Sequence, residues 1–165
     1  MYINVFSYKK AVEYLYMGDS YLKNWISIRD KNYEYLYKDL DIGTSNVLIL
    51  FFDDVTNYSI KHNLIHPIYK EISKSRNLIL FNKSIAKSIL DFTNNIFNNN
   101  PNDILNIHCW AGKSRSQAIG YVLNIYYNLY LSNNIKHFQR NIQHNNQNFI
   151  GNQDVIKIMN EICFS

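Results

Sequence analysis

Short apolar runs alternate along the chain with longer segments that have helical periodicity. Val47–Phe52 is an uninterrupted apolar run typical of a buried strand, and Asp103–His108 predicts a second buried strand. Tyr2–Phe6 and Asn24–Ile28 predict shorter strands. Strands that alternate with helices are typical of α/β folds with a central, mostly parallel sheet flanked by helices.

Four segments repeat apolar residues every three or four positions, as helices do when they bury one face. The predicted helices are Tyr8–Met17, Asn82–Phe97, Ser116–Leu131 and a C-terminal helix capped by Asp154. Ser116–Leu131 contains so few charged residues that we expect it to lie in the core.

Nothing along the chain marks a domain boundary. There are only two prolines and no linker-like segment, and 165 residues fit one domain spanning 1–165. The Asn-rich stretches Asn94–Asn102 and Asn141–Asn148 predict loops, because Asn favours turns. The sequence therefore predicts a single α/β domain.

The composition narrows the class of protein. The 25 Asn, 23 Ile and 13 Lys are read from AT-rich codons, so these residue types carry little information about function. No apolar run approaches the roughly 20 residues that a membrane-spanning helix needs. The chain begins without a secretory-signal pattern, and two cysteines cannot form a disulfide framework, so we expect a cytoplasmic protein. The net charge of +4 comes from scattered lysines and does not favour a nucleic-acid partner.

Rare residue types gather at one predicted strand–helix junction. Residues 108–116 read His-Cys-Trp-Ala-Gly-Lys-Ser-Arg-Ser, which fits the pattern His-Cys-x-x-Gly-x-x-Arg-Ser. Five fixed positions between a buried strand and a helix make a chance match rare. Ligands of α/β proteins bind at the carboxyl ends of strands, so this junction is the candidate site.

The residue types in this loop suit phosphate binding beside a nucleophile. Arg115 offers a planar fork for two phosphate oxygens, and Gly112 permits a backbone conformation that other residues resist. The positive field favours the thiolate of Cys109, which can attack phosphorus and form a thiophosphate intermediate. Ser116 Oγ is placed to donate a hydrogen bond to the sulfur as it leaves. Backbone amides at the helix N-terminus complete the phosphate cradle, from Trp110, Ala111, Gly112, Lys113, Ser114 and Arg115.

The loop resembles the Cys-x5-Arg loop of the protein tyrosine phosphatase superfamily. Its Ala-Gly and Ser-Arg-Ser residues resemble the compact dual-specificity branch, and Phe-Asp-Asp-Val at 52–55 is similar to a strand end in small bacterial and viral phosphatase-like proteins. The resemblance implies a phosphatase acting on a phosphorylated protein or peptide without a cofactor. It also implies that His108 holds the cysteine loop through backbone contacts and is not a base.

The leaving group needs a proton from a carboxylic acid on another loop, and the carboxylate can then activate water. Asp53 and Asp54 follow the Val47–Phe52 strand at its carboxyl end, where the site is expected. Asp103 begins a strand and so lies at the wrong end of the sheet, and Asp91 falls within a helix.

Asp54 is the predicted acid, because an aspartate just before aliphatic Val55 matches the relatives better. Asp53 is a supporting residue, and one of the two aspartates is expected instead to brace the loop or pair with Arg115. Asp54 precedes Cys109 by 55 residues, further than in the compact dual-specificity pattern. The additional segment, 57–82, is either a basic substrate-recognition lid, partly helical around Pro67–Ser73, or a solvated insertion.

Phosphotyrosine is the leading substrate, with phosphoserine or phosphothreonine as further ones. Lys113 either adds charge toward a second phosphate or is one more exposed lysine, and Trp110 either lines the pocket mouth or packs on the surface. A phosphoinositide phosphatase, an RNA 5′-triphosphatase and a phosphate-binding pseudophosphatase stay open as alternatives. For Cys163, we favour a buried position in the core over a redox pair with Cys109. We expect no metal, because the remaining histidines lack a ligand spacing with the cysteines, namely His62, His66, His137 and His144.

Overall fold

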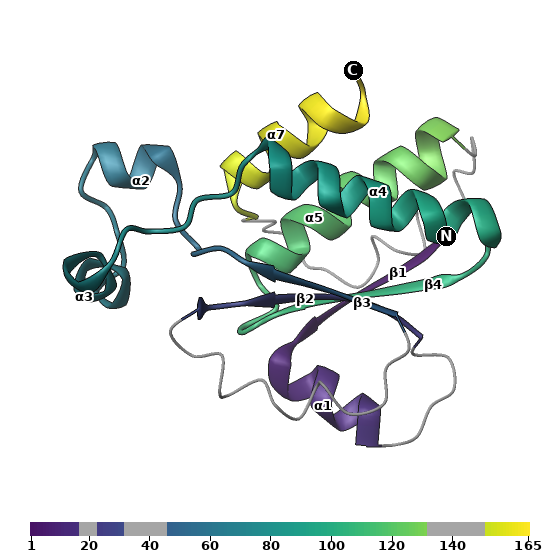
Figure 1. Cartoon of the computed structure of the whole chain (residues 1–165), viewed down its shortest axis with the longest axis horizontal. Coiled ribbons are helices and arrows are strands. Elements are labelled where there is room, and N and C mark those ends of the chain that lie inside the picture. Colours follow the sequence, from purple (N-terminus) through teal and green to yellow (C-terminus); the bar gives the residue numbers. More distant parts are fainter. Residues whose placement is uncertain (17–22, 32–45, 132–150) are drawn as a thin grey trace.

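One parallel sheet forms the centre of the molecule in the computed structural model, which describes residues 1–16, 23–31, 46–131 and 151–165 (Figure 1). The strands lie in the order β1-β4-β2-β3, and all three neighbouring pairs are parallel. Their bounds are β1 (Tyr2–Ser7), β2 (Asn24–Arg29), β3 (Asn46–Phe51) and β4 (Ile104–Cys109). The predicted α/β class with a parallel sheet is confirmed. The predictions for Met17, His137, Asn141–Asn148 and His144 lie outside the described residues.

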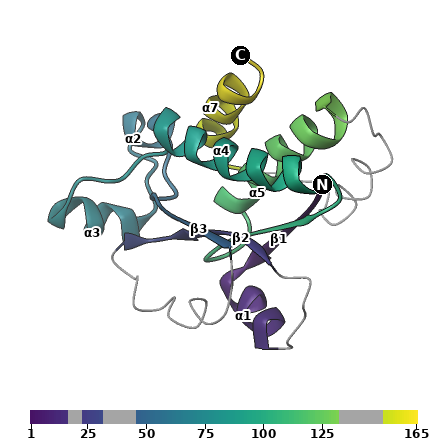
Figure 2. The same ribbon diagram turned by 45° about the vertical axis from the view of Figure 1, so that its right-hand side comes forward.

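Helices cover both faces of this sheet (Figures 1 and 2). Helix α1 (Tyr8–Tyr16) lies on one face, where Ala11 packs on Trp25. Three helices cover the other face, α4 (Lys83–Asn99), α5 (Arg115–Asn124) and α7 (Gln153–Cys163). Two shorter helices, α2 (Asn57–Lys61) and α3 (Pro67–Ser75), extend outward beyond the end of β3.

Helix α5 is the centre of the core, as expected for the sparsely charged segment Ser116–Leu131. Eight of its ten residues are buried between the sheet and the neighbouring helices. The helix continues to Leu131 as predicted, although residues Ile125–Leu131 form a π-helix, η2, in place of further α-helical turns. Tyr127 and Asn128 in this π-helix are both buried. The Tyr127 hydroxyl is hydrogen-bonded to Thr93 Oγ1, and Asn128 Oδ1 accepts from the Met1 amine. The last three residues of η2 are exposed, so the core ends before them.

The structure corrects three further predictions. The apolar run Val47–Phe52 predicts a fully buried strand, but β3 lies at an edge of the described sheet and Ile49 is 41% exposed. Asn152, and not Asp154, caps α7 by accepting from the Val155 amide. Helix α4 continues to Asn99 into the predicted Asn94–Asn102 loop, because Ile96 still faces the core.

None of the helices in the described ranges is both long and apolar enough to cross a membrane.

A row of asparagine side chains crosses all four strands near their amino ends. Asn4 Nδ2 donates to Asn106 Oδ1 at 3.1 Å, and Asn106 Nδ2 donates to the Asn24 carbonyl at 3.3 Å. Asn46 Nδ2 donates to Asn24 Oδ1 at 2.8 Å, and Asn24 Nδ2 donates to Asp103 Oδ2 at 3.0 Å. Asp103 therefore lies at the opposite end from the carboxyl ends of the strands, as predicted. This asparagine row joins each strand to its neighbour.

We expect Asn24→Ala to lower the free energy of unfolding by roughly 2 kcal/mol, because it leaves buried polar partners unpaired. Asn98→Ala, on the exposed side of α4, is the matched control and should change stability by less than about 0.5 kcal/mol. Urea titration measures both. Equal effects of the two substitutions would contradict a structural role for the asparagine row.

Candidate active site

The loop of residues 110–114 joins the end of β4 directly to the start of α5. Gly112 has φ +68°, in the left-handed region that favours glycine. A Cβ there would lie 2.5 Å from the Ser7 backbone nitrogen at the end of β1. Both the backbone conformation and the close approach of β1 therefore require glycine at this position.

The loop carries backbone donors without protein partners. Within the described ranges, the amides of residues 111–114 donate to no protein acceptor. Ser114 is the N-cap of α5 but makes no side-chain capping bond, so the helix N-terminus is also unsatisfied. Gln117 Nε2 donates to the Gly112 carbonyl at 3.1 Å, which fixes the loop from the helix. Free amides at a helix N-terminus form an anion-binding site.

Cys109 lies at the base of this loop and is only 2% exposed. Its Sγ lies 3.1 Å from Ser116 Oγ, within hydrogen-bonding distance. The Ser116 hydroxyl is fully buried and can donate to a thiolate at this position. The two residues predicted as nucleophile and leaving-group donor are thus brought into contact.

Arg115 is buried and forms an ion pair with Asp30 through two hydrogen bonds. Nη1 donates to Oδ1 at 2.9 Å and Nη2 donates to Oδ2 at 3.1 Å. Nη1 also donates to the Phe52 carbonyl at 2.7 Å. Burial alone would lower the pKa of Arg115, but the charge of Asp30 raises it above its ordinary value. Nε has no partner in the described part of the chain, so one buried donor of the guanidinium stays available to an anion.

Asp30 was missed by the sequence reasoning, which considered only Asp53 and Asp54 as partners for Arg115. It directly follows β2, at the same end of the strands as Cys109. The rule that selected Asp53 and Asp54, a carboxylate at the carboxyl end of a strand, would also have selected Asp30. The predicted strand ended at Ile28, one residue before β2 ends, so Asp30 did not directly follow it.

Asp53 points away from the loop and holds the segment after α3. Its carboxylate accepts from Arg76 Nη1 and Nη2 at 2.9 and 2.8 Å, and from the Ile79 amide at 2.7 Å. These hydrogen bonds raise the pKa of Arg76. Of the two aspartates expected to brace the loop or pair with Arg115, Asp53 does neither, because Arg76 and Ile79 occupy its carboxylate.

Asp54 lies at the loop itself. Its Oδ1 accepts from Ser114 Oγ at 2.7 Å and from Asn152 Nδ2 at 3.2 Å. Asn152 thus links the acid to the start of α7, a contact that the sequence did not indicate. Of the two adjacent aspartates, only Asp54 lines the cavity beside Cys109.

His108 is fully buried beneath the loop, with Nε2 at 2.8 Å from Ser27 Oγ. Burial and the nearby charges of Arg29 and Arg115 lower the pKa of His108 to about 3, against a small opposing effect of a hydrogen bond with the Cys109 backbone. The imidazole is therefore neutral at pH 7 and braces the cysteine.

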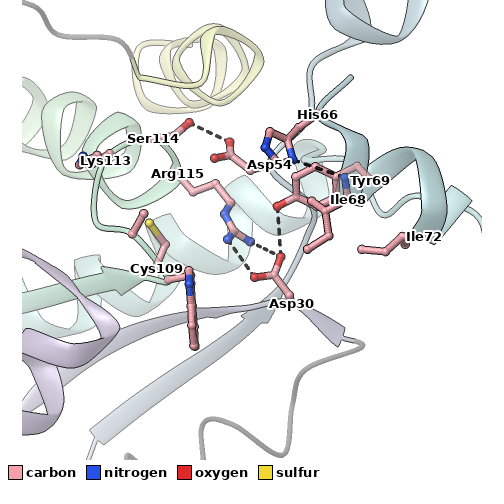
Figure 3. Close-up of a pocket in the computed structure, with 12 residues that line it drawn as sticks. Asp30, Asp54, His66, Ile68, Tyr69, Ile72, Cys109, Lys113, Ser114 and Arg115 are labelled. Carbon is pink, nitrogen blue, oxygen red and sulfur yellow. Dashed lines mark hydrogen bonds and ion pairs between the residues drawn. The ribbon is translucent and has the colours of Figure 1, made fainter. Parts of the chain in front are cut away.

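A cavity of about 580 Å³ opens above Cys109 and Arg115 (Figure 3). Trp110 and Lys113 line it from the loop. Trp110 also stacks on Tyr8, so it both lines the pocket and packs on the surface of the protein. The opposite wall comes from the segment around α3, through His66, Ile68, Tyr69 and Ile72. The segment 57–82 is therefore part of the pocket, with α2 and α3 as its helices.

The remaining candidates lie apart from this cavity. Asp91 is exposed and pairs with Lys87 at 3.5 Å on α4. Cys163 is a buried core residue of α7, and burial raises its pKa to about 11. No group of histidine, cysteine and acidic side chains suited to a metal occurs within the described residues.

No protein-family model and no curated protein matches the sequence. One solved structure is similar, described as "Crystal structure of Tk-PTP in the active form". It is 15% identical, with a TM-score of 0.46, and the match covers 99% of this chain and 92% of that chain. A likeness this distant supports no conclusion about activity.

The lowered pKa of His108 predicts a loss of stability in acid. The unfolded chain takes up this proton near pH 6.5, whereas the folded chain resists it down to about pH 3. The contribution of His108 is therefore complete above pH 6.5 and is lost as the pH falls toward 3, by at most about 1.4 kcal/mol per pH unit. Unfolding titrations between pH 4 and 8 should show this slope in the wild type and a shallower one in His108→Gln. Identical slopes would mean that His108 does not titrate this way.

Proposed function

We propose that this protein is a cysteine-dependent phosphatase that hydrolyses phosphotyrosine, with phosphoserine and phosphothreonine as further substrates. The observation that carries the proposal is the convergence of three features on one loop. These are the buried thiol of Cys109, the unpartnered amides of residues 111–114 and the available Nε of Arg115. Together they match the needs of a phosphoryl group attacked in line by sulfur.

In the proposed first step, the Cys109 thiolate attacks phosphorus. The sulfur–phosphorus bond forms, the bond from phosphorus to the ester oxygen breaks, and the leaving oxygen takes the proton of Asp54. Arg115 and the loop amides stabilise the charge on the three phosphoryl oxygens. The product of this step is a cysteinyl phosphate and a free alcohol or phenol.

In the second step, the Asp54 carboxylate takes a proton from water, whose oxygen attacks phosphorus. The phosphorus–sulfur bond breaks, and Ser116 donates a hydrogen bond to the departing thiolate. Inorganic phosphate leaves and Asp54 is again protonated, so the cycle closes without a cofactor. His108 takes no proton in either step, because it is neutral and bound to Ser27.

The cavity supports an aryl phosphate as the leading substrate. Its walls include the rings of Tyr69 and Trp110 and the aliphatic chains of Ile68 and Ile72, which suit an aromatic ring. The exposed Lys113 at its rim favours a second anionic group, and this keeps a phosphoinositide or an RNA 5′-triphosphate as the second candidate.

Cys109→Ser should reduce hydrolysis of a small aryl phosphate by about 10⁴-fold or more, because the hydroxyl is a far weaker nucleophile. Binding of a phosphopeptide should persist, since Arg115 and the amides stay in place. Steady-state kinetics on phosphotyrosine peptide, phosphoserine peptide, phosphoinositide and triphosphorylated RNA would rank the substrates. If the wild type binds phosphopeptide without turnover, the protein is a binding module and the proposed activity is wrong.

Asp54→Asn should lower kcat by about 10²-fold or more for phosphates with poor leaving groups, and much less for good ones, because only the former need the proton. Asp53→Asn is the matched control. It weakens the pair with Arg76 and should lower the melting temperature without changing the dependence on the leaving group. The reverse result would make Asp53 the acid.

A further inference from the structure

We propose that Tyr69, on α3, is a positioning residue that holds Asp30, and through it Arg115, in their working arrangement. The inference rests on the proposed function, and it makes the 57–82 segment part of the catalytic apparatus as well as a wall of the pocket.

The first observation is a shared carboxylate oxygen. The Tyr69 hydroxyl donates to Asp30 Oδ1 at 3.4 Å, and the same oxygen accepts from Arg115 Nη1 at 2.9 Å (Figure 3). The phenol contact is long for an O–H···O bond, as contacts of catalytic groups often are before substrate binds. Rotation of the Asp30 carboxylate would therefore disturb the phenol and the guanidinium together.

The second observation concerns the acid loop. Tyr69 and Asp54 line the same cavity beside Cys109. Burial raises the pKa of Tyr69, more strongly than the Arg115 charge lowers it, so the phenol keeps its proton and can donate to Asp30. The hydroxyl thus contacts the carboxylate that orients Arg115, in the same cavity as the carboxylate of Asp54.

The third observation is that α3 is itself firmly placed. Ile72, three residues after Tyr69, is 6% exposed and anchors the helix on the body of the protein. Arg76, the C-cap of α3, forms its ion pair with Asp53. Because Asp53 is adjacent to Asp54, this ion pair joins the C-terminal end of α3 to the Asp54 segment, and Tyr69 has a defined position relative to it.

Tyr69→Phe isolates the hydroxyl, because it keeps the ring and its packing in the cavity. Tyr58→Phe is the matched control, the same chemical change on α2 of the same segment. Tyr58 is 65% exposed, and its ring contacts His62 away from the cavity lining. A melting temperature for each variant would show that both fold.

The test compares kcat and KM for a series of aryl phosphates whose leaving phenols differ in acidity. For Tyr69→Phe we expect kcat/KM to fall about threefold to tenfold for every leaving group, as for the loss of a hydrogen bond to a charged group. The Kd of orthophosphate, measured by calorimetry, should rise about threefold because Arg115 is less well held. In the Asp54→Asn background, Tyr69→Phe should cause the same fold-loss, because the hydroxyl acts through Arg115 and not through the acid.

Wild-type values for Tyr58→Phe together with the expected losses for Tyr69→Phe would support the proposal. Equal kinetics and equal phosphate binding in the two variants would overturn it, as would a loss confined to poor leaving groups that disappears in the Asp54→Asn background. If the wild type shows no cysteine-dependent turnover, the proposed function fails, and phosphate binding alone then decides. Weaker binding by Tyr69→Phe than by Tyr58→Phe would still support the positioning of Arg115, and equal binding would refute it.

Discussion

The arrangement of the site depends on the buried ion pair between Arg115 and Asp30. Arg115 is the first residue of α5, Asp30 follows β2, and the Phe52 carbonyl that also accepts from Arg115 follows β3. The guanidinium therefore cross-links three separate chain segments at the carboxyl ends of the strands. Removing two charges from water is costly, and the pair is sustained because two parallel hydrogen bonds join the guanidinium to the carboxylate and a third joins it to a carbonyl. Among the described residues, Nε of Arg115 has no protein partner.

The two adjacent aspartates after β3 have different partners and different environments. Asp53 is buried against Arg76 and secures the end of α3, whereas Asp54 meets Ser114 and Asn152 beside the cysteine. One carboxylate holds the segment that walls the pocket, and the other lines the pocket beside Cys109.

The sequence was sufficient for the strands and for the loop, because both depend on local patterns. Periodicity located four strands to within a residue or two, and the fixed positions around Cys109 marked the junction with α5. The sequence was insufficient wherever a contact joins distant segments. The bonds of Tyr69 and Arg115 to Asp30, and of Asn152 to Asp54, link residues 39 to 98 positions apart. The edge position of β3 could likewise not be predicted, because an apolar run does not indicate how many neighbouring strands a strand pairs with.

The asparagine row at the other end of the sheet has a consequence for how the strands find one another. Apolar side chains are nearly interchangeable, so the isoleucines of neighbouring strands would tolerate several alignments. Amide groups are not interchangeable, since each needs a hydrogen-bond donor and an acceptor at the matching position on the neighbouring strand. A strand displaced by two residues would keep its apolar face inward but leave the amides of Asn24 and Asn106 unpaired in the interior. The asparagines of this row thus disfavour misaligned pairing of the strands, although the asparagine-rich composition is otherwise uninformative.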